Sequence, residues 1–415
     1  MPPYRRSFAT ICLLTPLIYI YWWRVRTAAI LGDLGASSIR GDVVNRTLGF
    51  SKIFVINLPS RTDRRDAMAL AGAVSNLTFT WIDGVAGNQV SDLVMPLGQG
   101  GRSSGAKGSW RSHMNALRAV VRDNLQSALI MEDDIDWDIR IKSQLQTFAS
   151  ASRTWLRESK SDKRQNELLD FVPPSLLARR GAVAAVAGHS ENAVQSTSAA
   201  GVANQAHQTP YGDDWDVLWL GHCGADLPSD QSPIPPLRVA IPNDETVPAP
   251  KHLKPHPFAL QDKLGKEYPP HTRIVHASSG NVCSLAYAVS HRGARKLLSE
   301  FDAHYETQWD LMLQKWCEGK YATKDKSLSD AEAKGDTKFQ EAGPVCITVQ
   351  PPLFSHYYAK GGSSNIVGQG GGYAKGTGSP YIRFSVRENL KRLVTGAPDS
   401  ELVDQLPDDG KTIWK

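Results

Sequence analysis

The sequence has few cysteines and no long run of basic residues, and these shortages exclude several classes of protein. Five cysteines in 415 residues are too few for a small disulfide-stapled scaffold, and none has CxxC or zinc-finger spacing. The 47 Lys and Arg residues exceed the 42 Asp and Glu residues by only 5 and form only short clusters, so a nucleic-acid-binding surface is not indicated. With 41% hydrophobic residues, the chain is too apolar to be wholly disordered. It also lacks the repeated long apolar runs of a multi-span membrane protein.

The one long apolar stretch lies at the N-terminus, over residues 7–23. It has arginines on both sides and ends in a cluster of Tyr and Trp residues. This pattern predicts a signal anchor, with a cytoplasmic tail at 1–6 and a stem at 24–50. A cleaved signal peptide is the alternative, because the apolar run is short. Either interpretation places the rest of the chain in the lumen of the endoplasmic reticulum or Golgi.

Four cysteines downstream of this stretch fit an oxidising compartment. Cys223, Cys283, Cys317 and Cys346 can form two disulfides in three possible connectivities. The sequence does not choose among the three.

The first part of the globular region alternates predicted strands and helices. Strands are predicted at 52–58, 77–82 and 128–131, and helices at 64–71, where Gly72 ends the helix, and around 110–121. Short links between such elements are typical of a parallel sheet with helices on its faces, which is the α/β class.

The later part of the chain is less regular. Strands are predicted at 215–220, 282–289 and 345–349, helices at 292–301 and 309–316, and loop insertions at about 178–208, 228–270 and 321–343. We therefore predict one decorated domain over 51–390, followed by a C-terminal tail at 391–415.

An acidic segment, Glu132-Asp133-Asp134, directly follows the predicted strand at 128–131. In open α/β sheets, ligands bind beyond the carboxyl ends of the strands, so these carboxylates lie where a site is expected. Clustered carboxylates can hold a hard divalent cation that keeps positions open for phosphate oxygens. The alternative is a solvated acidic loop with no ligand.

Three segments in this order resemble glycosyltransferase family 25, which includes lipooligosaccharide and collagen galactosyltransferases. They are Ile56-Asn57-Leu58 with Arg61, Asp63, Arg64 and Arg65; Gly108 to His113; and Leu129 to Asp134. A weaker likeness runs from Tyr287 to Leu298. The resemblance implies a GT-A type, Rossmann-like α/β domain that binds a UDP-sugar with a divalent metal, typically manganese.

Carried over by residue, the resemblance implies that Asp134 contacts the metal most directly. Glu132 or Asp133 would reach the ribose, or the metal through water. His356 is a candidate to complete the metal sphere, as a late residue does in many transferases of this fold, although a lone histidine is more often not a ligand. His222 has the same weaker status.

The remaining site candidates each have an ordinary structural alternative. For binding the nucleotide-sugar they are Asn57, Arg61, Arg64, Arg65, Asp83 and Ser112. His113 is a catalytic candidate that can equally be a hydrogen-bonded supporting residue. Asp310 is the candidate catalytic base, or else a carboxylate favoured by the helix dipole at a helix start.

The expected function is an inverting transfer of a hexose, galactose rather than glucose, from a UDP-sugar to a glycan or glycoprotein acceptor. The enzyme would be a membrane protein of the Golgi or endoplasmic reticulum with a lumenal catalytic domain. Two other classes stay open. One is a glycoside hydrolase that uses paired carboxylates, and the other is a non-catalytic lumenal sugar-binding protein.

Overall fold

The computed structural model describes residues 42–96, 103–160, 168–170, 209–229, 234–253, 263–321, 343–358 and 377–412. The predicted anchor at 7–23 and the predicted insertion at 178–208 lie outside these ranges. Within them, the structure contains no helix with the length and apolar character that a bilayer crossing needs.

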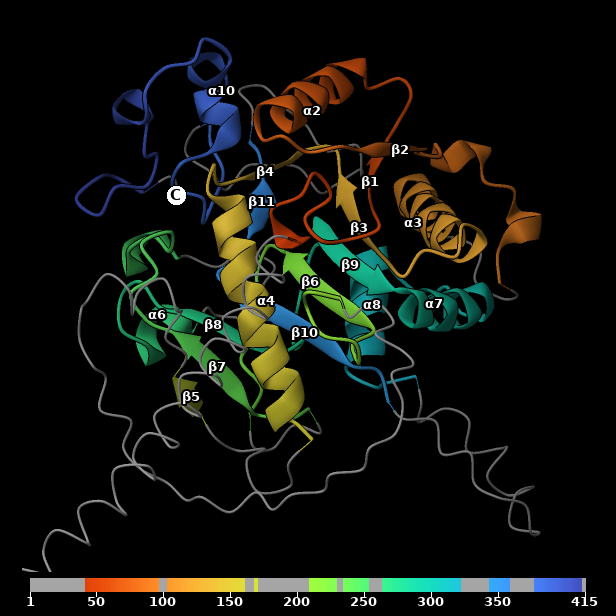
Figure 1. The fold of residues 1–415 in the computed structure, drawn as a ribbon. Helices are drawn as coiled ribbons and strands as arrows, with labels where there is room; N and C mark the ends of the chain where they lie inside the picture. The colour runs from red at the N-terminus through yellow and green to blue at the C-terminus, as the bar shows by residue number, and fades with distance from the viewer. Residues whose placement is uncertain are drawn as a thin grey trace, which may run out of the picture.

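A mixed sheet of eleven strands forms the centre of the molecule (Figure 1), with β2-β1-β3-β9-β6-β10-β8-β7-β5 as the main order. The strands are β1 Lys52–Asn57, β2 Thr80–Asp83, β3 Ser127–Glu132, β4 Ile135–Trp137, β5 Leu168–Asp170, β6 Val217–Gly221, β7 Arg238–Ile241, β8 Arg273–Ala277, β9 Ala286–Ser290, β10 Cys346–Gln350 and β11 Phe354–His356. Strand β1 pairs in parallel with β2 and β3, whereas β9 runs antiparallel to both β3 and β6. Strand β11 lies off the main path, between β4 and β6.

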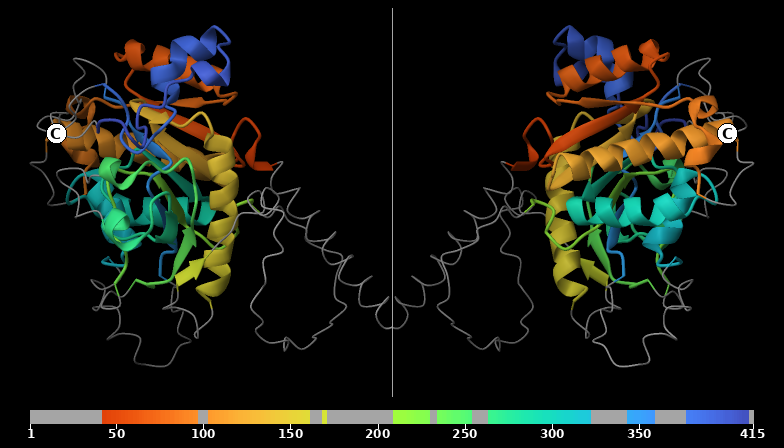
Figure 2. Two further views of the ribbon diagram at one scale, coloured as in Figure 1. Left: turned by 90° about the vertical axis from the view of Figure 1, so that its left-hand side faces the viewer. Right: turned by 90° about the vertical axis from the view of Figure 1, so that its right-hand side faces the viewer.

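Helices cover both faces of this sheet. They are α2 Thr62–Val74, α3 Ser104–Arg122, α4 Ile141–Glu158, α6 Leu264–Glu267, α7 His291–Ala303, α8 Trp309–Cys317 and α10 Val386–Val394, with 3-10 turns η1 Gly87–Gln89, η2 Asp92–Val94, η3 Pro250–His252 and η4 Asp399–Glu401. The helix α10 packs against α2, although more than 300 positions separate them in the sequence (Figure 2).

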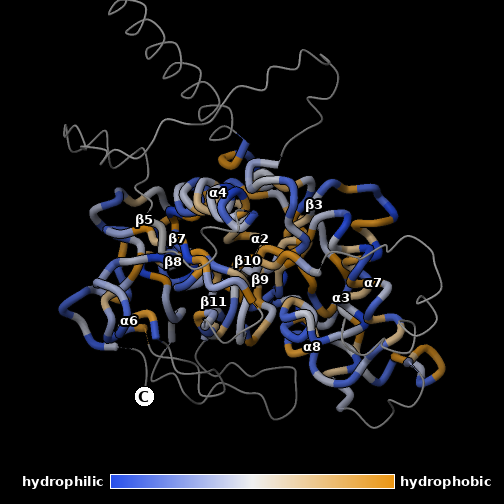
Figure 3. Tube along the Cα trace, turned by 90° about the horizontal axis from the view of Figure 1, so that it is seen from below, coloured by the Kyte–Doolittle hydropathy of each residue, from blue (hydrophilic) through white to orange (hydrophobic). Residues whose placement is uncertain are grey.

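Alternating side chains of the central strands supply two hydrophobic cores. On β3, Leu129 and Met131 join the core beneath α2 and α4, while Ala128 and Ile130 join the core beneath α3, α7 and α8. Hydrophobic residues accordingly concentrate along the inner strands when the molecule is viewed from below (Figure 3). A strand buried on both faces reads as a continuous apolar run, which explains why 128–131 is apolar throughout.

The predicted α/β class is confirmed, with β2, β1 and β3 parallel as expected. The sheet as a whole is mixed, so the expectation of a parallel sheet is correct only in part. The helix predicted to stop at Gly72 continues to Val74. Gly72 is needed for packing instead, because a Cβ there would lie 2.5 Å from the Phe79 ring.

The strand predicted at 282–289 is shorter and begins at Ala286. The residues before it form a loop tied to the sheet by a disulfide between Cys223 and Cys283, beside an isolated bridge between Gly224 and Val282. A second disulfide joins Cys317 to Cys346. The prediction of disulfides is confirmed, and one of the three connectivities is selected.

Candidate active site

The acidic segment lies at the carboxyl end of β3, beside the end of β1. Ile56 of β1 is in register with Glu132 of β3, so the next residue, Asn57, lies beside Asp133. The Asn57 amide donates to Asp133 Oδ2 at 2.7 Å, and both side chains are buried. Asn57 and Asp133 therefore form one buried polar contact at the strand ends, where α/β folds place ligands.

Arg64 connects the two aspartates from the first turns of α2. Its Nη1 lies 2.8 Å from Asp133 Oδ1 and 2.7 Å from Asp134 Oδ2. All three side chains are at most 16% exposed, so these are charge-assisted contacts in a poorly solvated position. Arg64, one of the three arginines after β1, thus lies directly on the acidic segment.

Asp134 also faces His356 of β11. His356 Nε2 lies 3.4 Å from Asp134 Oδ2. Burial opposes the charged forms of both groups, but their mutual attraction lowers the pKa of Asp134 and raises the pKa of His356. Two residues far apart in the sequence are thus neighbours in one polar site.

Asp134 and His356 are residue types that can bind a divalent cation. Asp134 Oδ1 is buried and has no hydrogen-bond partner among the described residues. A carboxylate oxygen without a partner, beside an imidazole, offers ligands that manganese accepts. Asp133 is less suited, because Asn57 and Arg64 occupy its two oxygens. Over the described ranges, no group of three or more His, Cys, Asp or Glu side chains with metal-binding geometry is present.

The Glu132 side chain is 32% exposed. Ser284 donates a hydrogen bond to its Oε1 at 3.0 Å. Burial of the carboxyl raises the pKa of Glu132 to about 8, and the negative charge of Asp134 is the second cause of this rise. A carboxyl with a pKa near neutral pH can gain and lose a proton under working conditions.

His113 is buried and lies next to Glu132. Its Nε2 lies 3.9 Å from Glu132 Oε1, its Nδ1 is 2.9 Å from the Tyr287 hydroxyl, and its ring stacks on Trp309 at 4.8 Å. Burial lowers the pKa of His113 to about 3, so the imidazole is neutral. These contacts favour a supporting role over direct proton transfer.

Asp310 lies at the start of α8 and belongs to the same site. Its Oδ2 accepts a hydrogen bond from the Cys283 backbone N–H at 2.8 Å, and burial raises its pKa. The charge of Asp310 also contributes to the raised pKa of Glu132, which places the two carboxyls in one electrostatic environment. The disulfide at Cys223 and Cys283 therefore holds a loop that contacts both acids.

Other predicted site residues lie farther from the acidic segment. Arg61 forms an ion pair with Asp63 at 2.6 Å. Arg65 lies over the Trp81 ring, 4.0 Å from Asp83, whose side chain is 76% exposed.

Two more candidates are held inside the fold. Ser112 donates to the Gly108 carbonyl and accepts from the Val85 backbone N–H, so it holds the loop that follows β2. The imidazole of His222 is buried, with Nε2 2.9 Å from the Val349 carbonyl oxygen.

Two contributors to this site were not predicted from the sequence. Arg387 of α10 contacts the backbone of the acidic turn, and Ser284 contacts Glu132. Neither lies within a recognisable motif, and no signal in the sequence spacing could have identified them.

Comparison with known proteins agrees with this geometry. A family model described as Glycosyltransferase family 25 (LPS biosynthesis protein) matches residues 50–199. Procollagen galactosyltransferase 1 of Danio rerio is 34% identical over 112 residues, which cover 24% of this chain and 18% of the relative. A glycosyltransferase 25 family member of Anopheles gambiae is 30% identical over 129 residues, or 26% of this chain and 22% of the relative. Each match thus spans less than a quarter of the relative's length. The resemblance predicted from the three motifs is therefore confirmed: residues 50–199 of this chain match glycosyltransferase family 25.

Proposed function

We propose that this protein is a glycosyltransferase of GT-A type that moves a hexose, galactose in the first instance, from a UDP-sugar to an acceptor hydroxyl. One observation carries the proposal: Arg64, Asp134 and His356 converge at the carboxyl ends of β1 and β3, inside or beside the family-matched segment. The names of the procollagen galactosyltransferase relatives support galactose as the sugar and a glycoprotein as the acceptor.

Asp134 and His356 would hold the divalent cation, manganese being favoured, and leave its other positions to diphosphate oxygens and water. The bound cation would stabilise the negative charge that develops on the UDP leaving group. Arg64 adds a guanidinium beside the same position and neutralises the aspartates before the donor arrives. Asn57 fixes the Asp133 side chain, so the carboxylates keep one arrangement.

Asp310 would remove the proton from the acceptor hydroxyl as the oxygen attacks the anomeric carbon from the face opposite UDP, which inverts the configuration. Its partly buried position and raised pKa suit a group that must take up a proton. Glu132, with its serine partner, would bind a sugar or ribose hydroxyl. His113 would keep Glu132 in place.

We place the catalytic domain in the secretory lumen, anchored through residues 7–23. Two disulfides support this location, because such bonds persist in oxidising compartments.

The direct test is release of UDP from a panel of UDP-sugars by the full chain, with and without manganese. We expect metal-dependent turnover of one donor, with UDP-galactose first, and no metal-dependent turnover in an Asp134→Ala variant. A chain that binds neither UDP nor any UDP-sugar, in either condition, would contradict the proposal. Turnover in which the product keeps the donor's anomeric configuration would contradict the inverting mechanism alone.

A further inference from the structure

The main chain of the acidic turn is held by residues from the end of the sequence. Arg387 Nη2 donates to the Asp133 carbonyl at 3.2 Å, and Arg387 Nε donates to the Ile135 carbonyl at 3.3 Å. Between these two, the Asp134 carbonyl accepts from the Tyr357 backbone N–H at 2.8 Å. Three consecutive carbonyls of the turn thus accept hydrogen bonds from two late segments.

Asp136, two residues after Asp134, is tied to the same late segment. Its side chain is fully buried, and its Oδ2 accepts hydrogen bonds from the hydroxyls of Ser379 and Ser385. Its Oδ1 accepts from the Arg387 backbone N–H at 3.1 Å. Asp136 therefore holds Arg387 next to the turn that Arg387 contacts.

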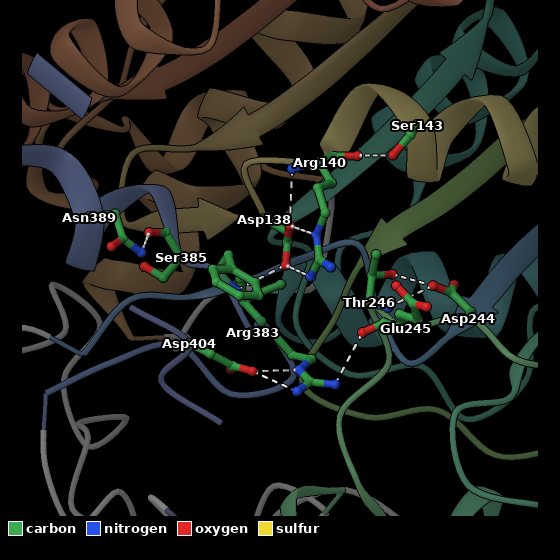
Figure 4. A network of polar contacts seen from close by, with 12 residues as sticks. Asp138, Arg140, Ser143, Asp244, Glu245, Thr246, Arg383, Ser385, Asn389 and Asp404 are labelled. Atoms are coloured by element: carbon green, nitrogen blue, oxygen red, sulfur yellow. Dashed lines mark hydrogen bonds and ion pairs between the residues drawn. The ribbon is translucent and has the colours of Figure 1, made fainter. Parts of the chain in front are cut away.

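The attachment continues past the turn, as Figure 4 shows. Asp138 accepts from the Phe384 backbone N–H at 3.0 Å and pairs with Arg140 at 2.7 Å. Four residues before Arg387, Arg383 pairs with Asp404 at 2.6 Å. Arg383 and Arg387 lie on the same segment but contact different partners.

The guanidinium of Arg387 suits this position better than an ammonium would. Its planar fork can reach two carbonyls at fixed directions, whereas a lysine has a single point of donation. The Arg387 side chain is partly buried and its guanidinium centre lies 5.5 Å from the Tyr357 ring, so its own orientation is restricted. The two donors of Arg387 hold the main chain of the turn, and the position of the main chain sets the directions of the side chains on the turn.

We infer that Arg387 is a positioning residue for the cation and diphosphate site: it holds the Asp133–Ile135 backbone so that Asp134 faces His356. The ligand part of this inference rests on the proposed function, while the positioning part rests on geometry alone. It also assigns a role in the site to the segment at 377–412, which lies beyond the family-matched residues.

The test compares Arg387→Gln with the matched control Arg383→Gln in the full chain. Amide hydrogen exchange of a peptide covering 127–138 reports on the turn, and calorimetry reports on binding of manganese with UDP. We expect Arg387→Gln to speed exchange and to weaken manganese–UDP binding, each about tenfold, the size expected for losing charge-assisted hydrogen bonds. Arg383→Gln should leave both at the wild-type values.

Equal exchange and equal binding in the two variants would overturn the inference, and so would faster exchange with unchanged binding, which a purely structural role would produce. If Arg387→Gln does not fold, Arg387→Lys gives the same comparison, because it keeps the charge and loses the two-point contact. If the wild-type chain binds no manganese–UDP, the proposed function fails. The exchange comparison then still decides whether Arg387 holds the turn.

Discussion

The early acidic turn and the late segments around it build one site by different means. The turn at 132–134 gathers three carboxyls within three consecutive residues at the end of a buried strand, inside the family-matched range. The late contributors, His356 and Arg387, come from separate elements and reach the turn only through tertiary contacts. The early region therefore supplies groups that a motif can show, and the late region supplies groups that only the fold brings to the turn.

The largest expected effect is at the turn itself. Asp134→Asn keeps the shape of the side chain but removes the charge that faces His356 and Arg64. We expect kcat/KM for metal-dependent UDP release to fall about 10²–10³-fold, the scale reported for loss of one preorganised electrostatic partner. Steady-state kinetics on the best donor measures this.

Asp63→Asn is the matched control, because Asp63 lies in the same early region, pairs with Arg61 and is 63% exposed. It should keep activity within a few fold of the wild type. If Asp134→Asn behaves like Asp63→Asn, the acidic turn is not the centre of the chemistry, and the comparison between regions loses its basis.

A smaller effect is expected from the late side of the same contact. His356→Gln keeps a polar side chain but loses the imidazole nitrogen that faces Asp134. Loss of an outer-shell partner of a metal typically lowers affinity by about 10–100-fold. Manganese affinity in the presence of UDP should fall by at least this factor. Calorimetry at several manganese concentrations checks this, with His304→Gln, on an exposed pair with Glu300, as control. Unchanged affinity would remove His356 from the site.

Sequence reasoning proposed the early candidate residues because they lie at or just after the ends of predicted strands. Asn57 lies at the end of the first predicted strand, Arg64 and Asp134 follow predicted strands, and parallel strands bring such ends together. His356 was named only through the family resemblance. Arg387 was not found, because its contacts are with backbone carbonyls, and any residue type at 133 or 135 would present them.

The same limit applies to the fold. The pattern of 52–131 predicted three strands and two helices that the structure contains, since apolar runs and short links define them locally. The antiparallel placement of β9 between β3 and β6 depends on the path of the chain through later loops, which no periodicity records.

The two disulfides offer a third contrast between site and scaffold. Cys283 donates its backbone N–H to Asp310, and the next residue, Ser284, contacts Glu132, whereas Cys317–Cys346 joins the end of α8 to the start of β10. Replacing either pair by alanine should lower the free energy of unfolding by about 2–5 kcal/mol. At low temperature, where both variants stay folded, only the Cys223→Ala/Cys283→Ala variant should lose turnover.

Urea unfolding and donor kinetics on the two double variants separate these effects. Equal losses of turnover would show that the first disulfide acts through global stability alone. A loss confined to the variant at Cys223 and Cys283 would show that the loop positions the carboxyls.

The smallest effect concerns a buried group remote from the acidic turn, His276 of β8. Its Nδ1 lies 2.7 Å from the Ala277 carbonyl oxygen and its Nε2 lies 3.0 Å from the Gln350 amide, which suits a neutral ring with one donor and one acceptor nitrogen. Burial lowers the pKa of His276 to about 3, so below pH 6.5 the unfolded chain binds a proton that the folded chain does not.

His276 therefore subtracts stability as the pH falls from about 6.5 towards 3, by up to about 1.4 kcal/mol per pH unit. His276→Gln cannot take up that proton. We expect the free energy of unfolding of His276→Gln to lie below that of the wild type at pH 7. This deficit should shrink by about 2 kcal/mol between pH 7 and pH 5. Urea unfolding at the two pH values measures the deficit, and donor turnover at pH 7 should remain at the wild-type level. A deficit that does not change with pH would mean that folded His276 is protonated, and lost turnover would extend the site to a strand that we assign to the scaffold.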